Sequence, residues 1–223
     1  FNLMAVSSAS SASALTSAST TSCLQIATRF ILVQTNHNGN VGAAARAMKT
    51  MGFDDLVLVE PRDPKVLRRD KTKHGASGAD NILSNAKVYA SLEEALDGVD
   101  IACATGMPVN MALDRPEQHF QPPRQYFSKM LSTATNQHKE DSSIVSSALP
   151  LPLNRIAFLF GNERVGLRPE DFDECDVVLG IPTNPEFGSL NVASAVQLIA
   201  YDWREAIGSY STDMLKDSRD HRL

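Results

Sequence analysis

Short apolar runs alternate along this chain with segments in which apolar residues recur at helical spacing. The runs are typical of strands buried on both faces, and they cover residues 30–34, 56–59, 87–90, 101–104, 156–160 and 177–181. Helical spacing predicts helices at residues 41–51, 92–96, 124–131 and 190–207. Because the strands alternate with helices, the pattern predicts an α/β fold with a parallel sheet flanked by helices.

The alternating pattern covers residues 30–207, which we expect to form one domain. Residues 1–29 are rich in Ser, Ala and Thr and contain no Asp or Glu. Read from Met4, they are typical of a transit leader for a chloroplast or a mitochondrion, and a disordered low-complexity tail is the alternative. Residues 132–152 are aperiodic and rich in Ser, Thr and Pro, which predicts a disordered insertion, and residues 208–223 form a polar tail.

Composition narrows the functional classes only modestly. The formal net charge of −5 argues against a general nucleic-acid binder, although local charge matters more to an RNA enzyme than the sum. The three cysteines and five histidines show neither a disulfide framework nor the spacing of metal ligands. We therefore expect a reducing intracellular compartment and no metal. No apolar run approaches the roughly 18 residues of a membrane span, so we expect no membrane association.

Three polar motifs occur in the loops and helix starts beside the predicted strands. They are Asn40-Val41-Gly42 followed by Arg46, then residues 161–167 (GNERVGL), and then residues 189–196 (SLNVASAV). In this order they resemble the three motifs of the SpoU class of SPOUT RNA methyltransferases. The resemblance implies a SPOUT-type sheet with a C-terminal deep trefoil knot, formed where residues 161–190 thread back. It also implies methyl transfer from S-adenosylmethionine to a ribose 2′-hydroxyl, here of a pyrimidine in the tRNA anticodon loop.

The resemblance implies a catalytic set of Arg46, Asn40, Glu163, Ser189 and Asn191. Arg46 would act with an RNA phosphate to deprotonate or orient the hydroxyl, because a guanidinium is too strongly protonated to be a base by itself. Glu163 would orient Arg46 through a charge-assisted hydrogen bond. Plainer interpretations stay open: Arg46 also fits an exposed helix position, and Glu163 one half of a surface ion pair. Asn40 also fits a turn or cap, and either Ser189 or Asn191 fits the N-cap of the last helix.

Three loops are implied to hold the methyl donor. Glycine in such loops lets backbone groups approach an adenosine closely, and apolar side chains can enclose it. The expected donor-binding residues are Thr105, Gly106, Met107, Gly161, Ile181, Gly188, Ser189 and Leu190. Neither a GxGxxG fingerprint nor the Lys-Ser/Thr of a phosphate loop is present, which disfavours a nicotinamide enzyme.

A basic segment at residues 64–74 is predicted to contact RNA phosphates. Its predicted RNA-binding side chains are Lys65, Arg68, Arg69, Lys71 and Lys73. The alternative for the same residues is a solvated helix face.

The last predicted helix carries a wide apolar surface, and residues 43–47 add a face of small residues. The apolar positions are Val192, Ala193, Val196, Ile199, Ala200 and Trp203. Either these residues are buried within one chain, or they form the interface of a homodimer. The resemblance implies the homodimer, with each active site built from both chains.

The leading functional interpretation is therefore an RNA ribose 2′-O-methyltransferase acting on tRNA. A catalytically silent SPOUT RNA-binding module and an rRNA 2′-O-methyltransferase are the alternatives. A silent module has no chemical need for Arg46, Glu163, Ser189 and Asn191 together, which favours the enzyme. Bacterial members of the family continue into a C-terminal extension that helps to bind tRNA, whereas helical pattern here fades after Ile207. The sequence therefore leaves the choice between tRNA and rRNA open.

Overall fold

The computed structural model describes residues 25–107, 120–136 and 153–210 of the chain. Residues 1–24 of the predicted leader, residues 137–152 of the predicted insertion and residues 211–223 of the tail lie outside the described residues. Among those that are described, no helix combines the length and the apolarity needed to cross a bilayer.

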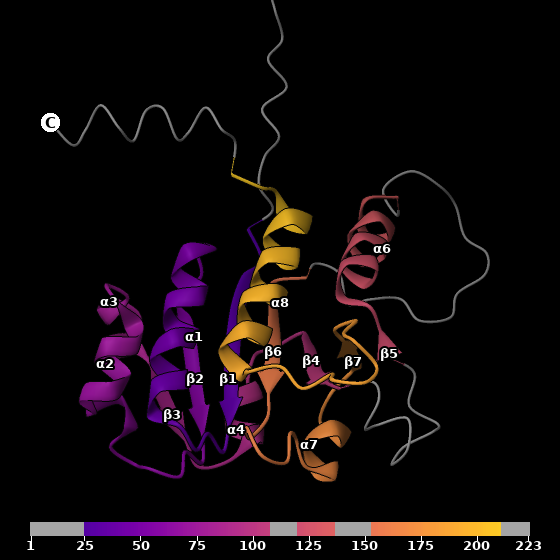
Figure 1. Cartoon of the computed structure of the whole chain (residues 1–223). Coiled ribbons are helices and arrows are strands. Elements are labelled where there is room, and N and C mark those ends of the chain that lie inside the picture. Colours follow the sequence, from indigo (N-terminus) through magenta and orange to yellow (C-terminus); the bar gives the residue numbers. More distant parts are fainter. Residues whose placement is uncertain (1–24, 108–119, 137–152, 211–223) are drawn as a thin grey trace, which may run out of the picture.

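Seven strands form one sheet in the order β3-β2-β1-β6-β4-β7-β5, and every neighbouring pair is parallel (Figure 1). This confirms the predicted parallel α/β architecture. The short strand β5 was not predicted, because two residues show no period. The trefoil knot stays a prediction. The strands are β1 (Ala27–Val33), β2 (Asp55–Val59), β3 (Lys87–Tyr89), β4 (Ile101–Gly106), β5 (Phe120–Gln121), β6 (Arg155–Phe160) and β7 (Val177–Gly180).

The four predicted helices are present as α1, α4, α6 and α8, with different ends for α1, α6 and α8, whereas α3 and α7 were not predicted. Ser91 is the N-cap of α4, since its side chain accepts a hydrogen bond from the Glu94 backbone N–H. Helix α6 continues into the predicted insertion, because its buried face anchors residues that have weak helix propensity of their own. The helices are α1 (Asn38–Thr50), η1 (Val66–Arg68), α2 (Asp70–Ala76), α3 (Asp80–Asn85), α4 (Leu92–Leu96), α6 (Pro123–Asn136), α7 (Pro169–Asp173) and α8 (Val192–Ile207).

The sheet begins before the predicted domain boundary at residue 30. Strand β1 starts at Ala27 and includes Arg29, whose side chain is only 6% exposed. The Arg29 guanidinium donates to Asp55 Oδ2 at 2.9 Å and to the Ala95 carbonyl at 2.7 Å. Hydrophobic periodicity does not identify a buried arginine as part of a strand. The predicted leader, residues 1–29, therefore includes the first three residues of β1.

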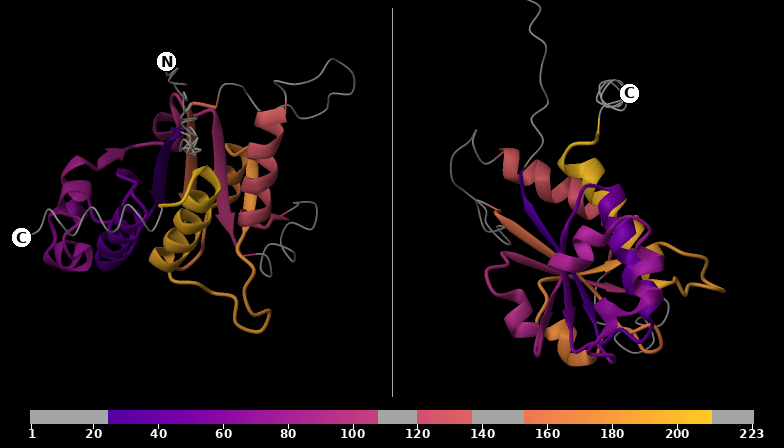
Figure 2. Two further views of the ribbon diagram at one scale, coloured as in Figure 1. Left: turned by 90° about the horizontal axis from the view of Figure 1, so that it is seen from above. Right: turned by 90° about the vertical axis from the view of Figure 1, so that its left-hand side faces the viewer.

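Helices cover both faces of the sheet (Figure 2), and a hydrophobic layer lies on each face. Side chains alternate between the faces along each strand, so Phe30 and Leu32 point into one layer and Ile31 and Val33 into the other. Helices α1, α3, α6 and α8 supply the first layer, whereas α4 and α7 supply the second. Burial on both faces explains why the strands read as continuous apolar runs.

Helix α8 is anchored in its own chain by Trp203. The indole is fully buried, donates to Thr28 Oγ1 at 2.8 Å, and packs edge-on against Phe127 and Phe158 at ring-centroid distances of 5.1 and 5.8 Å. Four of the six apolar positions predicted for a dimer interface are core residues of the single chain: Val196, Ile199, Ala200 and Trp203. Those four residues therefore do not indicate a partner.

Helices α1 and α2 pack with their backbones in close contact. A Cβ at Gly42 would collide with the Thr72 carbonyl oxygen and lie 2.8 Å from the Ala76 nitrogen. Thr72 is fully buried, and its hydroxyl donates to the Asn38 carbonyl at 3.0 Å. The small residues of α1 thus bring α2, with its basic side chains, directly against the helix that carries Arg46.

Replacing Gly42 by Ala is expected to destabilise the fold by about 1–3 kcal/mol, since overpacking at a rigid backbone contact costs that much. Gly39→Ala is the matched control on the same helix, because a Cβ there meets nothing within 4 Å. It should leave the free energy of unfolding unchanged or raise it by roughly 0.5–1 kcal/mol. Urea denaturation measures both. Equal stability of Gly42→Ala and wild type would contradict the close packing of the two helices.

Candidate functional site

The polar motifs meet at the carboxyl edge of the parallel sheet, where ligands bind in open α/β folds. The loops that follow β1, β4, β6 and β7 all begin at this edge, which lies at the bottom of Figure 1. The loop between β7 and α8 projects from the body of the domain, as both views of Figure 2 show.

A cavity of about 560 Å³ lies among these loops. All eight residues expected to bind the donor line it: Thr105, Gly106, Met107, Gly161, Ile181, Gly188, Ser189 and Leu190. Asn162 and Thr183 of the implied donor loops line the cavity too, as do Leu167 and, from helix α7, Phe172, which sequence reasoning did not single out. Its volume lies within the usual range of roughly 300–1,000 Å³ for small-molecule sites.

The backbone of the loop that follows β6 requires a glycine at position 161. Asn162 and Gly166 exchange two backbone hydrogen bonds of 3.0 and 2.8 Å, which fold residues 162–166 into a tight turn. A Cβ at Gly161 would collide with the backbone of Gly166 and Leu167. We expected this glycine to admit a ligand, but the contact it permits is internal to the loop.

Glu163 is the centre of the polar network at the rim of the cavity. Its Oε1 accepts from Thr35 Oγ1 at 3.1 Å, the His37 N–H at 3.1 Å and Asn40 Nδ2 at 3.0 Å. Its Oε2 accepts from the Asn36 N–H at 2.8 Å. Burial raises the pKa of the Glu163 carboxyl, but hydrogen bonds from Asn36, Asn40 and His37 outweigh burial and lower the pKa below its usual value. The carboxylate is therefore ionised and acts purely as an acceptor.

Asn40 extends this network to the third motif. Its Nδ2 donates to Glu163, and its Oδ1 accepts from Asn191 Nδ2 at 3.0 Å. Asn191 is also the N-cap of α8, since its Oδ1 accepts from the Ala193 N–H at 2.9 Å. Of the two candidates for that cap, Asn191 is the residue used, and Ser189 lies on the cavity wall. Asn40 is not a cap, because α1 begins at Asn38 with His37 at its N-cap.

Arg46 is exposed on α1 and does not line the cavity. It lies six residues beyond Asn40, about 9 Å along the helix axis. Within the described parts of the chain it forms no hydrogen bond or ion pair, so the expected bond from Arg46 to Glu163 is absent from this chain. Glu163 instead holds the loop that follows β1, and a surface ion pair with Arg164 is not formed either. The expected catalytic set is thus divided within one chain.

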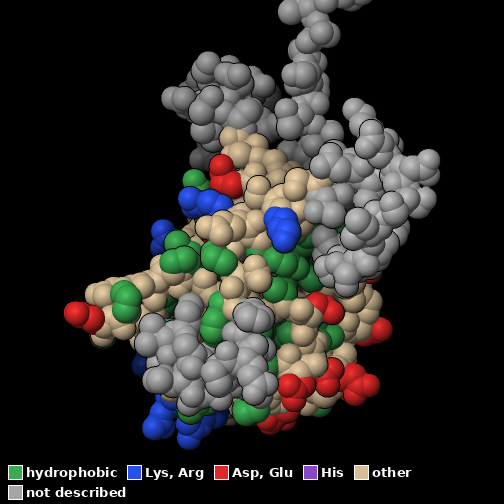
Figure 3. All heavy atoms as spheres, turned by 90° about the vertical axis from the view of Figure 1, so that its right-hand side faces the viewer, with side chains coloured by type: hydrophobic (Ala, Val, Ile, Leu, Met, Phe, Trp, Pro, Cys, Tyr) green, Lys and Arg blue, Asp and Glu red, His purple; other side chains and the backbone are tan. Residues whose placement is uncertain are grey.

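The basic side chains of residues 64–74 are exposed beside α1. Arg69 is already paired, since its Nε and Nη2 donate to Asp63 at 2.6 and 3.1 Å. Lys65, Arg68, Lys71 and Lys73 form no side-chain hydrogen bond or ion pair with the residues that are described. Figure 3 shows acidic and basic side chains gathered at different places along the lower edge of the molecule. Because the charges are segregated, the negative net charge does not preclude a local basic surface.

Neither described cysteine is set up for thiolate chemistry. Burial raises the pKa of the Cys103 thiol well above its usual value, and it raises that of Cys175 to about 12. No group of three or more His, Cys, Asp or Glu side chains that could hold a metal occurs among residues 25–107, 120–136 and 153–210.

Known proteins with similar sequences carry methyltransferase names. A TrmJ from Pseudomonas aeruginosa, described as a tRNA (cytidine/uridine/adenosine-2′-O-)-methyltransferase, is 38% identical over 80% of this chain and 60% of its own. An uncharacterized tRNA/rRNA methyltransferase from Haemophilus influenzae is 36% identical over 80% of this chain and 63% of its own. The chain thus spans less than two thirds of the length of these two relatives.

Solved structures and a family model agree with these relatives. A probable methyltransferase from Bordetella pertussis matches with a TM-score of 0.67 and 36% identity, over 82% of this chain and 97% of its own. TrmJ from Z. mobilis matches with a TM-score of 0.60 and 33% identity, over 79% of this chain and 68% of its own. The model of the SpoU rRNA Methylase family matches residues 27–201. The chain therefore belongs to the SpoU rRNA methylase family.

Proposed function

We propose that this chain transfers a methyl group from S-adenosylmethionine to a ribose 2′-hydroxyl of tRNA, at a pyrimidine of the anticodon loop. The observation that carries the proposal is the network of Glu163, Asn40 and Asn191 at the rim of the cavity, which joins all three motifs. Two relatives that are each 38% identical to this chain are named tRNA 2′-O-methyltransferases. The family name and the Haemophilus influenzae relative also point to rRNA, which is the alternative substrate.

The cavity has the size and lining for the donor. Met107, Ile181 and Leu190 provide apolar contact for an adenine ring, and Gly106 and Gly188 leave their backbone groups accessible. Bound there, the donor would supply a sulfonium methyl that needs no further activation. The tasks left to the protein are alignment and removal of the hydroxyl proton.

Arg46 provides the cation for this second task. Its guanidinium stays protonated and cannot take the proton, so Arg46 holds an adjacent RNA phosphate, and an oxygen of that phosphate accepts the proton of the 2′-hydroxyl. Glu163 and Asn40 hold the start of α1, and through it the helix from which Arg46 projects. Ser189 on the cavity wall provides a hydroxyl that can contact the ribose.

A homodimer would bring Arg46 of one chain to the cavity of the other. Arg46 does not line the cavity of its own chain, and we propose that it faces the cavity of a second copy. The exposed apolar side chains of α8 support this arrangement. Leu198 and Tyr201 are 42% and 44% exposed on the outward side of the helix, and Leu190 just before it is 38% exposed. Val192 and Ala193 at the start of α8 are only partly buried and extend this surface.

The proposed activity is tested with radiolabelled S-adenosylmethionine, with purified tRNA and rRNA as separate substrates and nucleoside analysis of the product. We expect label in 2′-O-methylpyrimidines of tRNA. Label in rRNA alone would make the protein an rRNA methyltransferase. RNA binding without transfer to either substrate would establish the silent module instead.

Replacing Arg46 by Ala is expected to slow methyl transfer by about 10²-fold or more, which is the usual contribution of a group that assists proton transfer. Donor affinity should stay within a few-fold of wild type, because Arg46 does not line the cavity. Single-turnover kinetics and calorimetry measure the two effects separately. Lys49→Ala is the control on the same helix, since Lys49 bonds to the Gly78 carbonyl and to Asn81. A collapse of donor binding in Arg46→Ala would contradict the role assigned to it.

Arg68→Ala is expected to weaken RNA binding and to reduce the slope of log affinity against log salt by roughly 0.7–0.9, the value for one lost phosphate contact. Arg69→Ala should change the slope less, because Asp63 already holds that guanidinium. Filter binding over a range of salt concentrations measures both slopes. If Arg68→Ala leaves the slope unaltered, the basic segment is only a solvated helix face.

An equimolar mixture of Arg46→Ala and Gly188→Trp chains is expected to regain roughly a quarter of wild-type activity, because half of the randomly paired dimers then hold one intact shared site. Gly188 suits this test because a Cβ there lies 3.3 Å from Met107 Sδ across the cavity wall. Each variant alone is the control and should be inactive. Light scattering that reports an active monomer would refute the dimer.

A further inference from the structure

Two residues at the carboxyl edge of the sheet have a backbone conformation that side chains disfavour. Gln34 has φ of 50° and Glu60 has φ of 46°, and each directly follows a strand, β1 and β2 respectively. Left-handed residues other than glycine are uncommon and persist where the surrounding structure holds them. Backbone hydrogen bonds do so here, from the Gln34 N–H to the Val59 carbonyl and from the Glu60 N–H to that of Tyr89.

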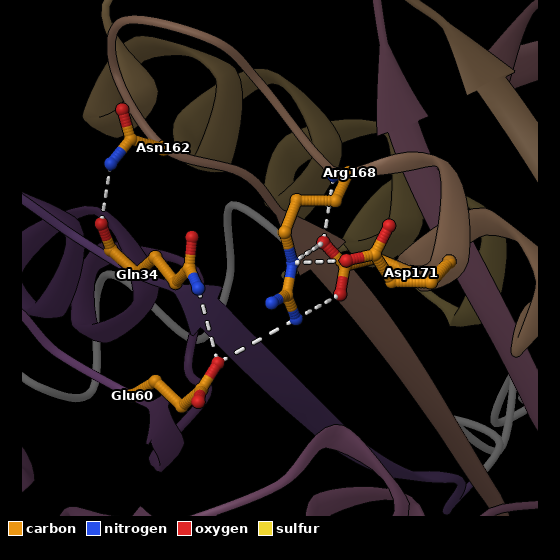
Figure 4. A network of polar contacts seen from close by, with 6 residues as sticks. Gln34, Glu60, Asn162, Arg168 and Asp171 are labelled. Atoms are coloured by element: carbon orange, nitrogen blue, oxygen red, sulfur yellow. Dashed lines mark hydrogen bonds and ion pairs between the residues drawn. The ribbon is translucent and has the colours of Figure 1, made fainter.

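The backbone carbonyl of Gln34 and the side chain of Glu60 contact the two ends of the cavity loop, residues 162–168 (Figure 4). At one end, Asn162 Nδ2 donates to the Gln34 carbonyl at 2.6 Å. Across the sheet edge, Gln34 Nε2 donates to Glu60 Oε2 at 3.1 Å. At the other end, Arg168 Nη2 lies 3.5 Å from the same Glu60 oxygen. The loop of residues 162–168 and the ends of β1 and β2 therefore form a closed ring of polar contacts.

Arg168 is held rigidly on the side away from Glu60. Its backbone N–H and guanidinium donate to Asp171 at 2.7, 3.2 and 2.9 Å, and Asp171 is only 2% exposed. This bidentate contact fixes the orientation of the guanidinium. Glu170 lies 3.3 Å from Arg168 Nε as well, but its side chain is 64% exposed and it makes no contact with the sheet.

The two backbone hydrogen bonds between Asn162 and Gly166 close the turn within the cavity loop but do not attach the loop to the sheet. Val165 is 75% exposed, and Gly166 has φ of 76°. Glu163 secures the first half of the loop, whereas the second half depends on Leu167, which is 8% exposed, and on Arg168. Ordering a loop before the ligand arrives lowers the entropic cost of binding.

We propose that Glu60 and Arg168 are positioning residues that hold the cavity loop in its donor-binding conformation. They act through the loop and do not touch the donor, since neither lines the cavity. The inference rests on the proposed function, in which this cavity binds S-adenosylmethionine. It adds to the three motifs a contact between β2 and the donor loop that none of the motifs contains.

Calorimetry with S-adenosylhomocysteine tests the inference on the full chain. Glu60→Ala is expected to weaken binding by roughly three- to tenfold, the effect of losing one charge-assisted contact. Glu60→Gln keeps an acceptor for Gln34 and Arg168 and should restore affinity to within about twofold of wild type. Glu170→Ala is the matched control, since it removes a carboxylate from the same guanidinium without breaking the ring.

The results distinguish a failure of the positioning role from a failure of the proposed donor site. If Glu60→Ala binds as tightly as wild type, or Glu170→Ala loses as much affinity, the positioning role is refuted. If wild type itself does not bind S-adenosylhomocysteine, the proposed function fails instead. Thermal unfolding of each variant checks that the fold is intact. Gln34→Ala breaks the same ring from β1 and should reproduce the loss if Glu60→Ala does not fold.

Discussion

The structure of the site depends on one carboxylate. Glu163 receives four hydrogen bonds, and all four come from residues 35–40. Two of the donors are backbone N–H groups just before α1, those of Asn36 and of the N-cap residue His37, and the N-cap N–H has no intrahelical partner. An ionised acceptor there satisfies those groups and favours the positive end of the helix dipole. The loop after β6 is thereby fixed to the loop after β1, and the cavity has a defined rim.

This constraint also explains why helix α1 is so rich in small residues. Glu163 fixes where α1 begins, and its remaining course is set by contact with α2 on one side and α8 on the other. Gly42 allows the backbone of α2 to touch α1, which leaves Arg46 exposed between neighbours rather than covered by them. A cation without a partner among the described residues is free to meet an anion from another molecule. Arg69 differs, because Asp63 neutralises it locally.

Helix α8 shows that one amphipathic pattern can serve two purposes. Its strongest apolar positions build the core around Trp203, where aromatic packing and the bond to Thr28 fix the helix to β1 and β6. Two further apolar side chains of α8, Leu198 and Tyr201, are exposed on its outward side. Periodicity marks all of these residues as apolar and cannot divide them between core and surface, because a wide stripe is compatible with either. How α8 packs against the sheet and the neighbouring helices decides which of these apolar residues are buried and which are exposed.

The sequence by itself determined the alternation of strands and helices and the three motifs, because each is encoded in local order along the chain, and the family resemblance of those motifs implied eight residues that line the cavity. Only the tertiary structure decided which partner each polar side chain meets. Glu163 binds Asn40 from 123 residues away, and Asn191 binds Asn40 from 151 residues away. The burial of Arg29 and the close contact of Gly161 with Gly166 and Leu167 likewise depend on the folded chain. Spacing along the chain reports which face a residue occupies, whereas a hydrogen bond between distant loops depends on how the strands are ordered in the sheet.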